Sequence, residues 1–163
     1  MKYCSKCGAE IMDEAVICPK CGCSTVPATT NAMKLKTNRG LLKTILLSLI
    51  TFGIYGLVVM SSISTDINII ASKHDGKKTM HFCLLFFIIA PLTLGIGALV
   101  WNHKISDRIG AELATRGIPY NFGASTFWLW GILGSLIIVG PFVFMHKLFK
   151  SMNLLSENYN NVG

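Results

Sequence analysis

Three long stretches of this 163-residue chain contain no Asp, Glu, Lys or Arg, and they limit what it can fold into. They run from Thr44 to Thr65, from Thr79 to His103 and from Gly117 to His146. Each can hold the roughly 20 apolar residues that a helix needs to cross about 30 Å of hydrocarbon. Only 14% of the residues are charged, against about 25% in a typical soluble domain. The composition therefore predicts an integral membrane protein.

We expect apolar segments at about residues 42–62, 82–101 and 126–146, inside a membrane domain at residues 41–158. After each segment, apolar residues recur three or four positions apart, which is the spacing of one face of a helix. These stripes are Ile63, Ile67 and Ile70; Ile105, Ile109 and Leu113; and Leu148, Met152 and Leu155. The predicted fold class is an all-α integral membrane domain of three transmembrane helices, each followed by an amphipathic helix. Residues 159–163 are expected to be a short tail.

Glycines and prolines inside the apolar segments allow a second arrangement. Small residues such as Gly53 and Gly97 can let membrane helices approach one another closely. Pro91 and the pair Gly140-Pro141 could instead break the helices and form re-entrant hairpins, provided that protein or water satisfies the freed backbone groups. Crossing segments would alternate in orientation, whereas hairpins would leave all three units on one face. Both arrangements are compatible with the sequence.

The second and third apolar segments share a pattern of residues that suggests an internal repeat. Glycine, histidine and lysine coincide at an offset of 43 positions. The matching residues are Gly97, His103 and Lys104, and Gly140, His146 and Lys147. A period of this length is typical of a unit of one apolar helix and one following helix. We interpret the two histidines as interfacial side chains at helix ends, in preference to a metal or proton-transfer role.

The first 23 residues contain two Cys-x-x-Cys pairs, formed by Cys4, Cys7, Cys18 and Cys21. In this spacing both sulfurs of a pair can face one ion, and a glycine after the second cysteine can take the positive φ that closes the turn. Disulfides would require an oxidising compartment, and a redox Cys-x-x-Cys would require a βαβ domain. Residues 1–23 are therefore predicted to be a zinc ribbon with two knuckles and a short β-hairpin, folded around one structural zinc ion.

Two further cysteines are not expected to bind metal. Cys23 lies too close to Cys21 for a knuckle and is interpreted as a spare thiol. Cys83 lies in an apolar segment and is interpreted as a small buried hydrophobe. The cysteine pattern resembles the short zinc-ribbon domains at the N-termini of many bacterial and archaeal membrane proteins.

Residues 24–40 are rich in small polar residues and are predicted to be a flexible basic linker. A basic cluster at its end is expected to contact anionic lipid headgroups. The cluster consists of Lys34, Lys36, Arg39 and Lys43. A net charge of +7 could also indicate nucleic-acid binding, but the excess lies beside the apolar segments and the zinc ribbon itself is nearly neutral. Nucleic acid is therefore not an expected partner.

The distribution of Lys and Arg predicts a cytoplasmic N-terminus in the cell membrane. With three crossings, residues 1–43 hold seven of these residues and the second connection holds three on the same side, against five on the other side. The positive-inside rule places the richer side in the cytoplasm.

Several motifs resemble the domain of unknown function 4234 family of prokaryotic integral-membrane proteins. They are Thr51-Phe-Gly53-Ile54-Tyr55-Gly56, the later Asp66-Ile67-Asn68 and an echo at Thr93-Leu-Gly95-Ile96. The resemblance spans about residues 40–158. It implies a small multi-pass membrane domain, sometimes fused to a zinc ribbon, with no established activity.

No arrangement of residues in the sequence indicates catalysis. The sequence contains no motif for a nucleophile with a base, for paired carboxylates, for a phosphate-binding glycine loop or for a dinucleotide-binding site. We therefore expect no enzyme activity and identify no small-molecule substrate. The expected role is an interaction or regulatory scaffold at the lipid bilayer, with a protein partner or further copies of the chain. A small transporter or channel component is the alternative, and a membrane enzyme comes third.

Overall fold

Three helical hairpins make up residues 35–163 in this computed structural model, which describes residues 2–4, 7–12, 18–23 and 34–163. Each hairpin has a short incoming arm, a turn and a long outgoing helix. The first consists of α1 (Leu41–Ile50) and α2 (Ile54–Asp75). The second runs through α3 (Phe82–Leu84), the π-helix η1 (Leu85–Ile89) and α4 (Ala90–Leu92) into α5 (Ile96–Thr115). The third runs through α6 (Ala124–Thr126), the π-helix η2 (Phe127–Ile132) and the 3-10 helix η3 (Leu133–Leu136) into α7 (Gly140–Val162).

Each predicted apolar segment turns back near its middle, at residues 51–53, 93–95 and 137–139. Of the two arrangements compatible with the sequence, the structure has the one in which each segment turns back, and three transmembrane helices through residues 42–62, 82–101 and 126–146 are not confirmed. Among the described residues one helix, α2, is long and apolar enough to cross a membrane by length and composition. Its Ile63, Ile67 and Ile70 are buried inside the protein.

The first two turns have the same backbone conformation. Gly53 and Gly95 take φ values of 90° and 88°, and the preceding Phe52 and Leu94 take 50° and 49°. A residue with a side chain costs roughly 1–2 kcal/mol at positive φ. Phe52 and Leu94 carry this cost, and the glycine that follows each of them does not. Both Phe52 and Leu94 are more than 90% exposed, at 97% and 93%. An apolar side chain therefore stands at the tip of each turn.

A threonine hydroxyl closes each of these two turns. Thr93 Oγ1 donates to the carbonyl of Ile89 at 2.6 Å and accepts the N–H of Gly97 at 2.9 Å. Thr51 Oγ1 makes the equivalent bonds to Leu47 and Tyr55, at 2.7 and 3.0 Å. These hydroxyls contribute to satisfying the backbone groups that a helix break leaves without an intrahelical partner.

The third turn is built differently, on a close approach of two glycines. Ile137 N–H donates to Gly134 C=O at 3.0 Å, and Gly140 N–H donates to Ile137 C=O at 2.8 Å. A Cβ on Gly140 would overlap the backbone of Gly134. Glycine at position 140 therefore lets the outgoing helix start directly against the incoming arm.

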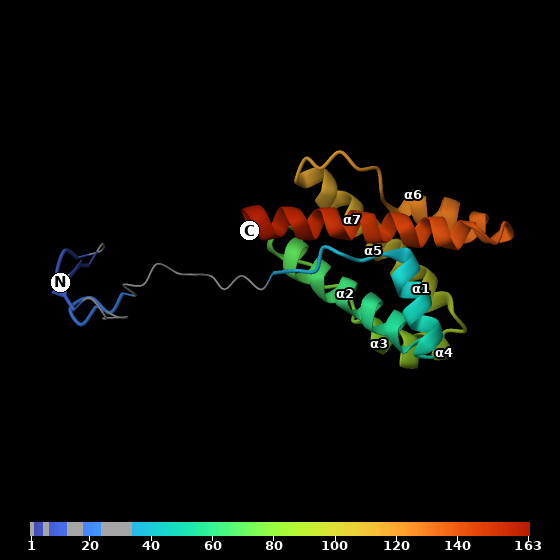
Figure 1. The fold of residues 1–163 in the computed structure, drawn as a ribbon, viewed down its shortest axis with the longest axis horizontal. Helices are drawn as coiled ribbons and strands as arrows, with labels where there is room; N and C mark the ends of the chain where they lie inside the picture. Colours follow the sequence, from blue (N-terminus) through green and yellow to red (C-terminus); the bar gives the residue numbers. More distant parts are fainter. Residues whose placement is uncertain (1, 5–6, 13–17, 24–33) are drawn as a thin grey trace. The chain divides into compact units, whose positions relative to one another are not determined.

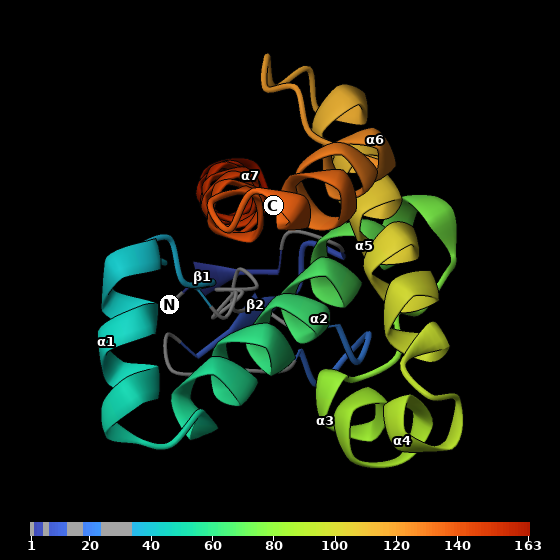
Figure 2. The same ribbon diagram turned by 90° about the vertical axis from the view of Figure 1, so that its right-hand side faces the viewer.

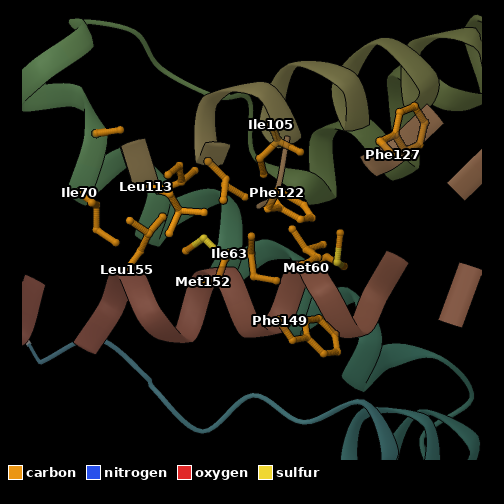
Figure 3. Close-up of a cluster of buried hydrophobic side chains, with 14 of the residues drawn as sticks. Met60, Ile63, Ile70, Ile105, Leu113, Phe122, Phe127, Phe149, Met152 and Leu155 are labelled. Carbon is orange, nitrogen blue, oxygen red and sulfur yellow. The ribbon is translucent and has the colours of Figure 1, made fainter. Parts of the chain in front are cut away.

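The three long helices α2, α5 and α7 run in the same direction, so the three turns lie at one end of the bundle, on the right of Figure 1. Figure 2 shows the three hairpins from that end. The predicted apolar stripes are confirmed, because all nine of their residues are at most 1% exposed. Side chains from all three helices point toward one another in Figure 3. Each buried Ile, Leu or Met contributes roughly 1.5–3 kcal/mol.

The ends of the long helices away from the turns are joined by buried polar contacts. Arg108 on α5 is 9% exposed and binds Asp75 at the end of α2, with Nε to Oδ2 at 2.6 Å. Its guanidinium also donates to Asn68 Oδ1 at 2.5 Å and Thr79 Oγ1 at 2.7 Å. Arg108 thus ties α5 to α2 and to the loop after it.

The linker predicted at residues 24–40 is described only from residue 34 onward, and residues 24–33 lie outside the described residues. Residues 35–40 run along α7 instead of forming a free tether. Leu35 is 6% exposed and pairs through its backbone with the side chain of Asn160. Arg39 pairs through its backbone with Asn153 in the same manner. We call residues 35–40 the strap. At the other end of the chain α7 continues to Val162, so most of the predicted tail is helical.

Candidate metal centre and apolar hairpin surface

The first cysteine pair is carried by a small β-hairpin. β1 (Lys2–Tyr3) pairs antiparallel with β2 (Glu10–Ile11), with Tyr3 opposite Glu10. Beyond β1, Cys4 N–H donates to Ala9 C=O at 2.9 Å, and Gly8 N–H donates to Cys4 C=O at 2.8 Å. Gly8 takes φ 68°, as the turn predicts. The hairpin and its turn thus fix the backbone of the first knuckle.

The second cysteine pair repeats this geometry. Gly22 N–H donates to Cys18 C=O at 2.8 Å, Gly22 takes φ 69°, and Cys18 N–H donates to Cys23 C=O at 2.9 Å. A hydrogen bond from the backbone of Cys21 also lowers the pKa of the Cys18 thiol.

The structure brings the four predicted ligands together. The Sγ atoms of Cys4, Cys7, Cys18 and Cys21 all lie within 4.8 Å of one another. Two of the separations, Cys4 to Cys21 and Cys7 to Cys18, are 3.7 Å. Tetrahedral Zn–S bonds of about 2.3 Å require sulfurs about 3.8 Å apart. The residues therefore fit a four-thiolate zinc site, and the Cys4 and Cys18 side chains are buried while the other two are exposed.

The remaining cysteines lie outside this group. Cys23 is half-buried, and its backbone carbonyl supports the second knuckle. Cys83, expected to be a small buried hydrophobe, is also half-buried, with Sγ 3.1 Å from Ser61 Oγ.

Exposed apolar side chains gather on the arms and turns of the three hairpins. They fall within residues 42–58, 84–100 and 128–142, where Lys43 is the single charged residue. The most exposed are Phe52, Leu94, Leu136, Ile138 and Leu92, at 97%, 93%, 85%, 81% and 77%. Scattered exposed apolar residues are ordinary on a soluble protein, but many of them on the arms and turns at one end of a bundle mark an interaction site. We call it the apolar hairpin surface.

The predicted basic cluster divides into two groups. Lys34, Lys36 and Lys43 are exposed. Arg39 instead forms an ion pair with Asp66 on α2, and the Arg39 side chain is only 4% exposed. Burial lowers the Arg39 pKa, and the nearby Asp66 charge opposes that shift. Arg39 therefore holds the strap in place and is not a free cation on the surface.

The six repeat-equivalent residues occupy comparable places on α5 and α7. Gly97 and Gly140 lie in the first turn of their helices, and each packs against its incoming arm. His103, Lys104 and His146 are exposed and Lys147 is half-buried. His103 Nδ1 accepts a hydrogen bond from Trp128 Nε1 at 3.0 Å, which links the second and third hairpins.

The residues that sequence reasoning missed are those that join distant parts of the chain. Asn153 and Asn160 lie two helical turns apart on α7 and bind the strap. Their seven-residue spacing is the signal that could have indicated a shared face.

Two family models match the chain. Residues 3–25 match a zinc-ribbon domain, and residues 39–111 match the family described as domain of unknown function (DUF4234). The second match covers the first hairpin and most of the second, while the third hairpin lies outside it. Searches of curated proteins and of solved structures found no match. The chain thus carries a zinc-ribbon domain at residues 3–25 followed by a DUF4234 domain at residues 39–111.

Proposed function

We propose that the protein is a zinc-ribbon scaffold anchored in one leaflet of the cell membrane by three re-entrant hairpins. The observation that carries this proposal is the apolar hairpin surface, which lies at one end of the bundle. Exposure of such a surface to water is unfavourable, whereas contact with acyl chains is favourable. The surface includes the three turns, so insertion would begin at Phe52, Leu94 and residues 136–138.

The lengths of the hairpin arms support insertion into one leaflet. The incoming arms run from Leu41 to Ile50, from Phe82 to Leu92 and from Ala124 to Leu136. At 1.5 Å per residue they rise about 15–20 Å, against about 30 Å for the whole hydrocarbon layer. Hairpins of this depth do not reach across the hydrocarbon layer, so they do not by themselves form a transport path. The arm lengths therefore favour a membrane anchor over a transporter.

The charges of the chain also support this arrangement. All 15 Lys and Arg residues and all 8 Asp and Glu residues lie outside residues 44–65, 79–103 and 117–146. If the hairpins return to the side they entered from, every charge stays on one side of the membrane. The positive-inside rule then favours the cytoplasm for that side. The reducing cytoplasm also keeps the four cysteines available to zinc.

In this proposal the zinc ribbon is a docking module and has no catalytic role. Zinc would make a small rigid face from a segment too short to fold by apolar burial alone. The hairpins would hold that face at the membrane, where a protein partner or another copy of the chain binds it.

Cysteine labelling from each side of the membrane tests the hairpins. Single cysteines are placed at Lys78, between the first two hairpins, and at Asn161, near the C-terminus, in a background with Cys23→Ser and Cys83→Ser. Hairpins expose both positions to an impermeant thiol reagent from the N-terminal side. Three crossings would expose both only from the opposite side, which would overturn the proposal.

Two control positions accompany the labelling, and the Cys23→Ser, Cys83→Ser background without an added cysteine gives the labelling due to the four zinc ligands. Asn121→Cys lies on the N-terminal side in both arrangements and must label there. Leu94→Cys lies at a turn tip and is expected to resist the reagent from either side because it faces acyl chains.

A capture experiment tests the docking role separately. Proteins bound to the intact chain are compared with those bound to Cys4→Ser and to Cys23→Ser. Partners that are lost with Cys4→Ser and kept with Cys23→Ser support docking through the folded ribbon. An unchanged set of partners would remove the docking role and leave the membrane anchor standing.

A further inference from the structure

A cleft of about 930 Å³ runs along the second hairpin. Residues of α5 from Ile96 to Ala111 form one wall, a length of about 22 Å along the helix axis. Ile89 of the incoming arm, Thr93 of the turn, Asp75 at the end of α2 and residues 77–80 of the following loop contribute the rest. The cleft is therefore long enough to reach from the apolar hairpin surface to the charged end of the bundle.

The two ends of the cleft differ in chemistry. Near the turn its walls are Ile89, Ile96, Gly97 and Val100, all within a charge-free stretch of the sequence. Ile96 and Val100 are exposed, at 65% and 47%. This end offers a surface on which an acyl chain can pack.

The other end of the cleft is basic. Lys77, Lys78 and Lys104 line it, all three are exposed, and none forms an ion pair with a described residue. Two acidic residues also lie here, but Asp75 is engaged by Arg108. Counting Arg108, Asp75 and Asp107, this end carries four basic and two acidic groups. An anionic group is therefore attracted to it.

Trp101 marks the boundary between the two ends. Its ring lines the cleft, and its Nε1 donates to Met80 C=O at 2.8 Å. Tryptophan with a satisfied N–H is characteristic of the level where acyl chains meet headgroups. The change from apolar to basic thus occurs at the depth where a phospholipid changes from chain to phosphate.

We propose that this cleft binds one anionic phospholipid. The phosphate lies among Lys77, Lys78 and Lys104, and an acyl chain lies along Ile96 and Val100 toward the turn. This inference rests on the proposed insertion of the hairpins, because a lipid reaches the cleft from the leaflet. Asp107 remains at the basic end and disfavours a headgroup of high negative charge, so a singly charged lipid such as phosphatidylglycerol fits best.

Fluorescence quenching of Trp101 tests the proposal. The protein, with Trp128→Phe and Trp130→Phe so that Trp101 alone reports, is reconstituted in phosphatidylcholine vesicles containing phosphatidylglycerol. Either the anionic or the zwitterionic lipid carries brominated chains, at equal mole fraction. We expect stronger quenching by the brominated anionic lipid, since each lysine near an anionic headgroup is worth roughly fivefold in affinity.

Matched lysine variants separate a site from general surface charge. The triple variant Lys77→Gln, Lys78→Gln, Lys104→Gln should lower the selectivity for the anionic lipid by fivefold or more. The control Lys36→Gln, Lys43→Gln, Lys147→Gln removes the same charge outside the cleft and should keep the selectivity. An equal loss in both triple variants, or equal quenching by both lipids in the parent protein, would overturn the proposal.

A second pair of variants tests the apolar end. Val100→Trp fills the cleft, whereas Leu99→Trp places the same side chain at the neighbouring exposed residue, which does not line it. Because an added tryptophan would obscure Trp101, bound lipid is measured here by native mass spectrometry of the detergent-solubilised protein. Retained phosphatidylglycerol should be lost with Val100→Trp alone. If neither brominated lipid quenches Trp101 at all, both the insertion and the cleft proposal fail, whereas equal quenching by the two lipids removes the cleft proposal alone.

Discussion

The side-chain amide of Asn160 accepts the backbone N–H of Leu35 at 2.8 Å and donates to the Leu35 carbonyl at 2.9 Å. Asn153 makes the same pair of contacts with Arg39, at 3.1 and 2.8 Å. The two asparagines thus bind the strap as a neighbouring strand would, although they belong to the last helix of the chain. The strap enters the first hairpin, so these contacts join the first hairpin to the third.

Removing these amides should release the strap. In the double variant Asn153→Ala, Asn160→Ala we expect faster hydrogen exchange at Leu35 N–H and Arg39 N–H, measured by mass spectrometry on strap peptides. Each lost hydrogen bond should cost roughly 1 kcal/mol of stability. Asn161→Ala, on an exposed position of the same helix, is the control and should leave exchange unchanged. Protection that persists in the double variant would show that the buried Leu35 side chain alone holds the strap.

Loss of one thiolate should empty the metal centre. Purified protein is expected to contain about one zinc per chain, and Cys4→Ser or Cys18→Ser should bring this close to zero because a structural site needs four ligands. Cys23→Ser should retain the metal, since Cys23 lies outside the group of four. Elemental analysis by mass spectrometry gives the stoichiometry. A Cys23→Ser protein that loses zinc would contradict the assignment of the ligands.

A single methyl group on Gly140 should disrupt the third hairpin. Its Cβ would overlap the Gly134 backbone, which cannot move aside as a flexible side chain can. Overpacking of this kind costs roughly 1–3 kcal/mol, so Gly140→Ala should lower the thermal unfolding temperature in detergent. Gly123→Ala is the matched control, because Gly123 has an extended φ of 173° and no atom within 4 Å of an added Cβ. Equal stability of the two variants would refute the close approach.

The ion pair of Arg108 and Asp75 should make stability depend on pH. Burial alone would raise the pKa of the Asp75 carboxyl, but hydrogen bonds and the charge of Arg108 hold it below its usual value. A carboxyl with a lowered pKa stabilises the fold above its unfolded pKa of about 3.9, and this contribution disappears as pH falls through the folded value. Urea unfolding of the detergent-solubilised protein should therefore weaken below about pH 4, and less so in Asp75→Asn.

Truncation of the arginine tests the same contact at neutral pH. Arg108→Ala removes the ion pair to the solvent-accessible Asp75 and the hydrogen bonds to Asn68 and Thr79, and it should cost roughly 1.5–3 kcal/mol, as the loss of charged hydrogen bonds does. The exposed neighbour Asp107→Ala should have little effect. A similar loss in both variants would contradict a specific contribution of the Arg108–Asp75 contact.

The parts of the structure that the sequence predicts are those with local signals. The four zinc ligands follow from a spacing that brings pairs of sulfurs to one side of a turn. The buried stripes follow from helical periodicity, and residues such as Ile67, Ile109 and Met152 are indeed fully buried. The starts of the apolar segments were also close, since Phe82 begins α3 as predicted.

The turns had a weaker signal. Pro91 and the pair Gly140-Pro141 lie beside the turns at residues 93–95 and 137–139, but they are equally compatible with helices that cross. Turns are usually recognised in a sequence by polar residues. Here the apolar residues Phe52 and Leu94 occupy the turn positions, and their side chains are almost fully exposed. Hydropathy is equally high before and after each turn, so it cannot distinguish a segment that crosses from one that returns. The partner of Arg39 was also hidden, since Asp66 lies 27 residues away and the pairing depends on the tertiary fold.

The shared orientation of the three hairpins has a consequence for how they could enter a membrane. In a three-crossing topology the loop with Lys77 and Lys78 would have to be translocated, and a charged residue inside hydrocarbon costs roughly 2.5–3.5 kcal/mol on insertion scales. Hairpins that enter and leave on one side carry only uncharged turns into the lipid. Assembly of this domain would then need no transfer of charge across the bilayer, and each hairpin could enter independently of the others.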